Sequence, residues 1–567
     1  MSQAIRRAQI PRLERARASP SGELARVEGR RVVTNPFFLA SLLAGLAIAF
    51  LLTRSELPVW GRLDVLLPVA LFPCAAVTLF LANLASSRTQ RDEVEDLYAS
   101  LPAPHSSVRR SILLGLLAPT GAAAMFVVVI VAFVFAGGAL GTPRVAELAV
   151  GPLVVLLCGA IGIVSGKWFP HEISAALSTA VVALAQVSIA FALTVSWARW
   201  LGPWVPASTA GDPAPELLIR PSAAHLLYLL SLIGLVGVLA LVPRTNARGT
   251  AATAVLAVIL VVTALLQASR ATEGRTELVA LVRDADVFRQ CEDREAARYC
   301  VFDGYEPLID HWDVPVRGVL STAPALPDGP LRVTQTLDAA GSDLPVREQS
   351  RLANRRGVDS ITGLPTLVTD THWGAGEALG MSELGLALGT ASWVTGLPPT
   401  ASALSPAPDV NASVLELVPA SARDAARKLL TSGGAEGCSS VGQGRSIVAL
   451  WLAAGATDAT EDLFREDVGS PPIQEGVFQE FDQAGPSIYL ATGNVVAWGK
   501  SETRYAIQLL DRPRGEVVAL LQDSWAELID ASTTTAEAAE LMALEPAVDG
   551  DAPSVERSLR AGFVPCP

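Results

Sequence analysis

Residues 86–111 read SSRTQRDEVEDLYASLPAPHSSVRRS and form a polar, charge-rich connection between two long apolar runs. Within it, apolar side chains recur at the spacing of one helix face and are followed by prolines that stop a helix. These apolar residues are Val94, Leu97, Tyr98 and Leu101. Thr89, three residues before Asp92, is a candidate N-cap for this helix. A short helix with one apolar face suits docking onto another protein, and the alternative is a solvated connector.

The flanking apolar runs are long enough to cross a membrane. The chain has 567 residues, of which 50% are hydrophobic and 17% are charged. A transmembrane helix needs about 20 predominantly apolar residues, with some tolerance. Seven uncharged runs of suitable length occur at Pro36–Leu52, Val65–Ala85, Ile112–Leu140, Leu148–Val164, Ile173–Trp197, Leu226–Val242 and Thr250–Leu266. We therefore expect an α-helical polytopic membrane domain over residues 36–267, with a six-span core and a seventh span.

Charge divides the chain into two unlike parts. Residues 1–267 hold 20 Lys and Arg against 13 Asp and Glu, whereas residues 268–567 hold 23 against 43. A nucleic-acid-binding domain needs a basic footprint, so the acidic second part argues against a nucleic-acid partner. No apolar run of spanning length follows residue 267, and we expect a soluble domain there.

The arginines predict an orientation in the membrane. Residues 1–35 hold eight of them, a basic region too long for a cleaved secretory signal, and residues 21–33 fit a helix at the membrane surface. With the N-terminus inside, the cytoplasmic segments hold 15 basic residues and the outer loops hold five. This bias predicts a multi-pass protein of the cell membrane with a cytoplasmic N-terminus and an extracytoplasmic domain over residues 268–567.

Cysteine usage agrees with that orientation. Four of the six cysteines fall in the second part, at Cys291, Cys300, Cys438 and Cys566. An even number in an extracytoplasmic domain suggests two disulfides, and four cysteines allow three pairings. In one of them, a Cys291–Cys300 bond closes a short hairpin and leaves Cys438 to bond Cys566. Free thiols are the alternative.

The second part mixes strand and helix patterns, which predicts an α+β domain. The period-two segments that read as strands are Leu331–Leu337 and Leu364–Thr369. The segments that read as helices are Met381–Trp393, Ser421–Leu430, Ser446–Ala454, Glu516–Ile529 and Thr535–Leu544. We expect its tryptophans to be core residues.

The sequence gives little support for a catalytic motif or a cofactor-binding motif. The segment Gly493–Ser501 has five residues between its glycines where a phosphate loop has four. The helix pattern at 381–389 carries Glu383 without the two histidines of an H-E-x-x-H zinc site, and no G-x-S-x-G elbow occurs. We expect no catalytic residue, no bound cofactor and no metal in this chain.

The assembled features resemble the membrane subunit of type-2 ABC exporters. That family carries an acidic patch, an L-x-x-L/S-L-P motif and then basic residues before the third span. The matching residues here are Glu95, Leu97, Ser100, Leu101, Pro102, Arg109 and Arg110. The resemblance covers about residues 25–242. Two segments of the second part, Cys291–Pro307 and Ile447–Thr457, are similar to the C-terminal regions of large actinobacterial permease-like proteins, some of which look like peptidase folds without zinc ligands.

The resemblance implies a permease that works with a separate cytoplasmic ABC ATPase and with a second permease subunit, as a homodimer or heterodimer. The helix carrying Val94, Leu97, Tyr98 and Leu101 would sit in a groove of the ATPase. The seventh span and the 300 extra residues depart from the basic family. Two other classes stay open: a membrane-anchored binding or sensor protein, and a membrane-tethered hydrolase.

Overall fold

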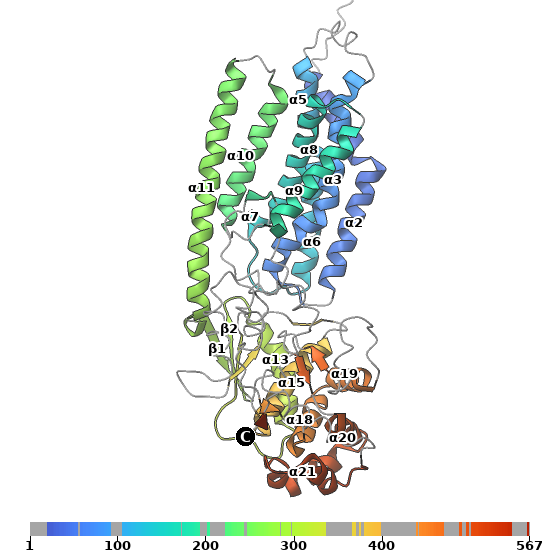
Figure 1. The fold of residues 1–567 in the computed structure, drawn as a ribbon, viewed down its shortest axis with the longest axis vertical. Coiled ribbons are helices and arrows are strands. Elements are labelled where there is room, and N and C mark those ends of the chain that lie inside the picture. The colour runs from blue at the N-terminus through green and yellow to red at the C-terminus, as the bar shows by residue number, and fades with distance from the viewer. Residues whose placement is uncertain are drawn as a thin grey trace, which may run out of the picture.

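The computed structural model describes most of the chain. The described residues are 20–54, 57–91, 105–171, 173–192, 201–203, 221–242, 247–283, 285–295, 297–335, 366–369, 373–375, 379–397, 438–439, 442–469, 487–489, 495–497, 500–546 and 564–565. They form a bundle of long helices and, at one end of it, a mixed domain of shorter helices and strands, which we call the outer domain (Figure 1).

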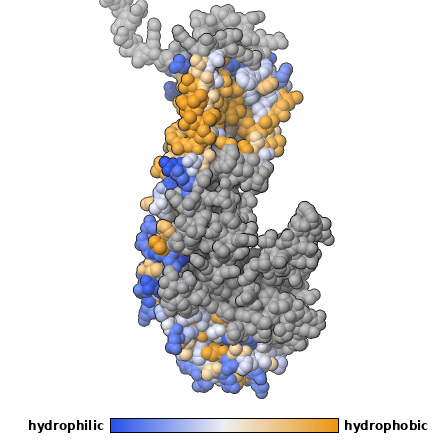
Figure 2. All heavy atoms as spheres, turned by 60° about the vertical axis from the view of Figure 1, so that its left-hand side comes forward, coloured by the Kyte–Doolittle hydropathy of each residue, from blue (hydrophilic) through white to orange (hydrophobic). Residues whose placement is uncertain are grey.

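The bundle is made of long helices that run side by side, with shorter ones at their ends (Figure 1). They are α1 (Pro20–Val33), α2 (Pro36–Thr53), α3 (Trp60–Arg91), α5 (His105–Gly115), α6 (Leu117–Ala136), α7 (Val145–Leu148), α8 (Val150–Trp168), α9 (Ile173–Ala192), α10 (Ser222–Leu241) and α11 (Ala247–Arg283). Within the described residues, five helical segments are long and apolar enough to cross a membrane. They are Leu66–Arg88, Ser107–Ala136, Val145–Trp168, Ser222–Leu241 and Gly249–Arg270. Figure 2 shows apolar side chains gathered over the bundle and hydrophilic ones below them.

The five segments coincide with five of the seven predicted spans. A sixth arises if α1 and α2, which meet at a 56° bend, count as one broken span. The bend has a local cause. Pro36 occupies the first turn of α2, and the side chain of Asn35 accepts a hydrogen bond from the Phe37 amide at 2.9 Å, so a new helix begins there. The apolar part of α9, Ile173–Gln186, is shorter than the other spans.

One sequence expectation at the charged loop is wrong. Thr89 was expected to cap a new helix, but α3 continues without a break through Thr89 to Arg91. The apolar segment of α3 is followed directly by residues that keep helical geometry, so no cap is needed at this point. Helix α11 ends at Arg283, so the last helix of the bundle extends beyond the predicted seventh span.

Helix α3 is the centre of the bundle and α11 is at its edge. Of the apolar window in α3, 61% is buried, compared with 6% of the window in α11. The most extensive helix contact in the described part of the chain joins α3 to α8. It is made by glycines that share one face of α8: Gly151, Gly159, Gly162 and Gly166. A Cβ atom on Gly162 would lie 2.3 Å from the carbonyl oxygen of Leu79, so the two backbones touch. Small residues that allow such an approach are the usual means of packing helices in lipid.

The outer domain is built on a mixed sheet. Its strand order is β1-β2-β3-β4, with β1 (Arg289–Asp293) antiparallel to β2 (Arg298–Phe302) and the next two strands, β3 (Arg332–Gln335) and β4 (Thr366–Thr369), parallel to it. The remaining strand pairs are β5 (Cys438–Ser439) with β8 (Val564–Pro565), and β6 (Ser487–Tyr489) with β7 (Val495–Ala497). Both strands predicted from the sequence, β3 and β4, are confirmed.

Helices fill the rest of the outer domain. They are α12 (Ala285–Phe288), α13 (Leu308–Leu320), α15 (Leu379–Val394), α18 (Gly444–Ala454), α19 (Asp458–Gly469), α20 (Lys500–Leu510), α21 (Arg514–Leu528) and α22 (Thr535–Leu541). Four of the five predicted helices are confirmed, and the fifth, Ser421–Leu430, falls outside the described residues. All eleven residues of α18 are buried, which makes it the central helix. As expected, Trp312, Trp373, Trp393 and Trp451 belong to the core.

The glycine face of α8 yields a prediction with a matched control. We expect Gly162→Ala to destabilise the bundle by about 1–3 kcal/mol, because the added methyl must push the α3 backbone away. In contrast, Gly121 on α6 has no atom within 4 Å of an added Cβ. Gly121→Ala should be neutral or stabilise by up to about 1 kcal/mol, because alanine favours the helix. Thermal unfolding of both purified variants in one detergent measures the difference. Equal stability of the two would show that α3 and α8 are not in close contact.

Candidate functional site

The sequence points to the connection between α3 and α5 as the functional segment. Its predicted contact residues, Val94, Leu97, Tyr98 and Leu101, fall outside the described residues. What the structure describes is the end of the bundle where α3 stops at Arg91 and α5 begins at His105. We call it the charged end and define it by Glu28, Asn83, Arg88, Ser165, Lys167 and Ser174.

Helix α1 is fixed at the charged end by close backbone contact. A Cβ atom on Gly29 would lie 2.8 Å from the carbonyl oxygen of Gly115 and 2.9 Å from the Cβ of Ala118. The glycines therefore let α1 cross directly over the point where α5 meets α6. Glu28 on the same helix bonds Arg31 at 2.9 Å and reaches Arg88 of α3 at 3.4 Å. Partly exposed ion pairs contribute only about 0–1 kcal/mol, so the glycine contact fixes α1 and the ion pair orients it.

A buried polar network joins α3, α8 and α9 next to α1. Asn83 is fully buried, and its amide nitrogen donates to Ser165 Oγ at 2.8 Å. The hydroxyl of Ser174, at the start of α9, donates to Asn83 Oδ1 at 3.1 Å. Buried amides are costly unless they are hydrogen-bonded, so this network specifies how the three helices meet.

Lys167 joins α8 to α10 at the same end. Its ammonium donates to the carbonyl oxygens of Leu239 at 2.8 Å, Ala240 at 3.3 Å and Val242 at 2.8 Å. These carbonyls belong to the C-terminus of α10, where backbone acceptors lack helical partners and the helix dipole is negative. Seven helices (α1, α3, α5, α6, α8, α9 and α10) are thus held together at the end where α3 stops and α5 begins.

The opposite end of the bundle is joined to the outer domain, at what we call the seam. The amide of Leu57, just before α3, donates to the carbonyl of Trp373 at 2.8 Å, and the amide of Gly141, just after α6, donates to that of Gly304 at 2.9 Å. Leu140 belongs to the same buried cluster as the core of the outer domain, and the ring of Tyr305 covers Gly141. Helix α3 therefore extends from the charged end to the seam, about 48 Å at 1.5 Å per residue.

Buried polar residues also occur on the seam side of the bundle. His225 in α10 is 2% exposed, and its Nδ1 lies 3.3 Å from Oε1 of Gln267 on α11. Glu147 in α7 is 5% exposed, and its Oε1 has no hydrogen-bond partner among the described residues. Neither was predicted as a site: Glu147 lies in a short helix just before a predicted span, and the partner of His225 is 42 residues away in the sequence.

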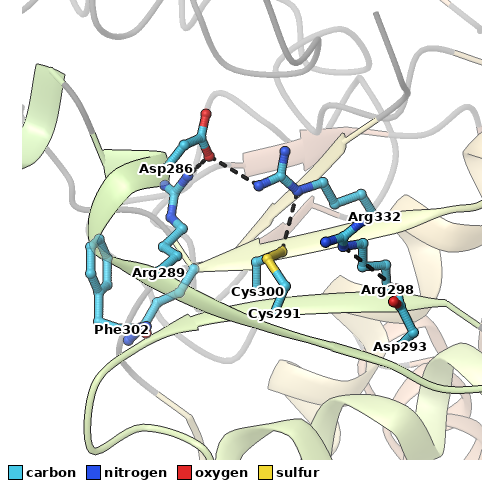
Figure 3. Close-up of a disulfide and its surroundings, with 9 residues drawn as sticks. Asp286, Arg289, Cys291, Asp293, Arg298, Cys300, Phe302 and Arg332 are labelled. Atoms are coloured by element: carbon cyan, nitrogen blue, oxygen red, sulfur yellow. Dashed lines mark hydrogen bonds and ion pairs between the residues drawn. A yellow bond between two sulfur atoms is a disulfide. The ribbon is translucent and has the colours of Figure 1, made fainter. Parts of the chain in front are cut away.

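The outer domain carries the disulfide between Cys291 and Cys300, with Cα atoms 4.1 Å apart (Figure 3). The two residues face each other across β1 and β2, as the hairpin pairing requires. Strand β5 places Cys438 opposite Val564 of β8. Cys566 lies outside the described residues, and its bond to Cys438 stays a prediction.

Helix α15 does not provide a zinc site. Ser382 and Leu386 flank Glu383 where an H-E-x-x-H helix carries its two histidines. Oε2 of Glu383 accepts a hydrogen bond from the Thr457 hydroxyl at 2.5 Å within the protein core. In the part of the chain that the structure describes, no three His, Cys, Asp or Glu residues gather in a way that could hold a metal ion.

Sequence reasoning missed Asn83 and Lys167, although both had a signal. Lys167 is the only lysine in the first 267 residues and lies three residues after the apolar run Leu148–Val164. Asn83 is the only amide side chain within the run Val65–Ala85, and a search for charged residues alone overlooks it.

The seam provides a prediction with a matched control. Gly304 and Gly329 both have left-handed backbone angles, with φ of 84° and 95°. An added Cβ would lie 3.2 Å from the Cα of Gly141 at Gly304, but would meet nothing within 4 Å at Gly329. Both alanine variants should incur backbone strain of about 1 kcal/mol. Gly304→Ala should lower the melting temperature by about 2–4 °C more than Gly329→Ala does. The reason is that its added methyl group pushes the backbone at Gly141 away from the outer domain. Equal melting temperatures would contradict a close contact there.

No family model matches this chain, and neither a curated protein nor a solved structure matches it.

Proposed function

We propose that the chain is the permease subunit of an ABC transporter, which moves a substrate across the cytoplasmic membrane with energy from a separate cytoplasmic ATPase. The observation that carries the proposal is the construction of the charged end. Glycine contacts, a buried amide network and a lysine cap hold seven helices together at the end where α3 stops and α5 begins. An ATPase that displaces the connection between α3 and α5 would therefore move the whole bundle and not the connection alone.

Helix α3 supplies the route by which such a push would travel. It is continuous from Arg91 to Trp60, and the amide of Trp60 donates to the Leu140 carbonyl at 2.9 Å beside the seam. Pro68 and Pro73 lie inside it, and prolines within a helix remove backbone hydrogen bonds and permit bending. Closure of two ATPase subunits would displace the charged end of α3, and the bundle would switch between inward and outward openings.

The arrangement of basic residues supports the proposed orientation. Arg31, Arg88 and Lys167 lie at the charged end, away from the outer domain. Cytoplasmic ends of membrane helices carry an excess of Lys and Arg, so the charged end would face the cytoplasm. The outer domain, with its disulfide, would then lie in an oxidising extracytoplasmic compartment, where disulfides persist. It would receive, pass on or gate the substrate through the seam.

The decisive experiment alters the apolar face of the predicted contact helix. The double variant Leu97→Asp/Tyr98→Asp should reduce co-purification of the ATPase at least tenfold and abolish ATP-dependent transport, since two buried carboxylates cannot be accommodated in an apolar groove. The control is Asp92→Asn/Asp96→Asn, which changes the opposite face of the same helix. It should retain the complex.

The ATPase is identified by affinity purification of the wild-type chain from its native membrane. Loss of the complex in the first double variant alone supports the proposal. Equal recovery of the ATPase with all three proteins would show that this face makes no contact, and capture of no ATPase by the wild type would refute the permease assignment.

A further inference from the structure

The surroundings of the Cys291–Cys300 disulfide differ sharply between its two sulfur atoms (Figure 3). Cys291 lies on the exposed edge strand β1, whereas Cys300 is fully buried on β2. An incoming thiolate can therefore approach the sulfur of Cys291 from solvent, and the sulfur of Cys300 is shielded. Thiol–disulfide exchange depends on which sulfur is accessible and on how good the other sulfur is as a leaving group.

Arg332 contacts the buried sulfur. Its Nε–H donates to Cys300 Sγ at 3.3 Å, and its Nη2 bonds Asp286 Oδ1 at 3.0 Å (Figure 3). The guanidinium comes from the neighbouring strand β3, where Arg332 pairs with Arg298 of β2, so the sheet itself holds it in place. A guanidinium beside a sulfur favours the thiolate over the thiol, and a stabilised thiolate leaves faster.

The hairpin that carries the disulfide connects the helix bundle to the sheet of the outer domain. β1 follows directly on α11 and α12, so it is the strand that joins the last helix of the bundle to the sheet. Asp286, on α12, bonds both Arg289 of β1 at 2.8 Å and Arg332 of β3. Opening the disulfide would remove the covalent link between this edge strand and β2 and leave only non-covalent contacts, such as the backbone hydrogen bonds and these ion pairs.

From this geometry we propose that Cys291–Cys300 is a thiol–disulfide exchange site, attacked at Cys291, with Arg332 stabilising Cys300 as the leaving thiolate. The reductant is a dithiol protein of the C-x-x-C class on the same side of the membrane. Its thiolate bonds to Cys291 Sγ, the Cys291–Cys300 bond breaks, and the electron pair leaves with Cys300 beside Arg332. The second thiol of the dithiol then displaces Cys291 and gives up its proton to it. The protein gains two reduced cysteines as the dithiol becomes a disulfide.

The direction of attack is tested on the full-length protein in detergent. The protein is treated briefly with reduced glutathione, free thiols are blocked, and trypsin separates the two cysteines into peptides Gln290–Arg294 and Tyr299–Arg317. Mass spectrometry should find the glutathione adduct on the Cys291 peptide in at least about tenfold excess, since the other sulfur is buried. An adduct mainly on the Cys300 peptide, or no adduct on either, would overturn the proposal.

The role of Arg332 is tested by the rate of reduction with dithiothreitol. Arg332→Gln should slow reduction at least about threefold, because the leaving sulfur loses its guanidinium. The control is Arg298→Gln on the same hairpin, where Arg298 is 3.5 Å from Asp293. Its rate should match that of the wild type. Unchanged or faster reduction in Arg332→Gln would mean that Arg332 only braces the hairpin, and would refute its assigned role.

Discussion

The close contact between α3 and α8 is the constraint on which the rest of the bundle depends. In a lipid environment the hydrophobic effect does not press helices together, so association relies on backbone approach and interhelical hydrogen bonds. Glycines on one face of α8 provide the approach, and Asn83 with Ser165 provides the hydrogen bond. Because α3 also extends from the charged end to the seam, the helix that is held most firmly is the one that connects the two ends.

Much of this architecture could be predicted from apolar runs and turn residues, because long uncharged runs have few alternatives to membrane helices. Strands β3 and β4 and four helices of the outer domain followed from periodicity. Other features depend on packing that no local pattern encodes. The burial of His225 against Gln267, and the contact of Lys167 with the end of α10, join residues far apart in the sequence. Thr89 was misread because a polar run after an apolar one resembles a helix boundary, although a helix can continue into water.

The outer domain combines a tightly packed interior with a disulfide whose two cysteines differ in exposure. The carboxylate of Glu383, on a helix of the core, accepts a hydrogen bond from the hydroxyl of Thr457. Ser382 and Leu386 occupy the positions at which an H-E-x-x-H helix carries its two zinc-binding histidines. The disulfide hairpin is the site with unlike surroundings, because it connects the sheet to α11 and joins an exposed cysteine to a buried one that Arg332 contacts.

The central claim is that the charged end faces the cytoplasm and the outer domain faces outward. His171, between α8 and α9 at the charged end, and Asp328, in a loop of the outer domain, are both exposed. The direct measurement is labelling of His171→Cys and Asp328→Cys with a membrane-impermeant maleimide, with the wild type as background. The account predicts that Asp328→Cys reacts in intact cells and His171→Cys only after lysis. The reverse pattern, or labelling of both from the same side, would contradict it.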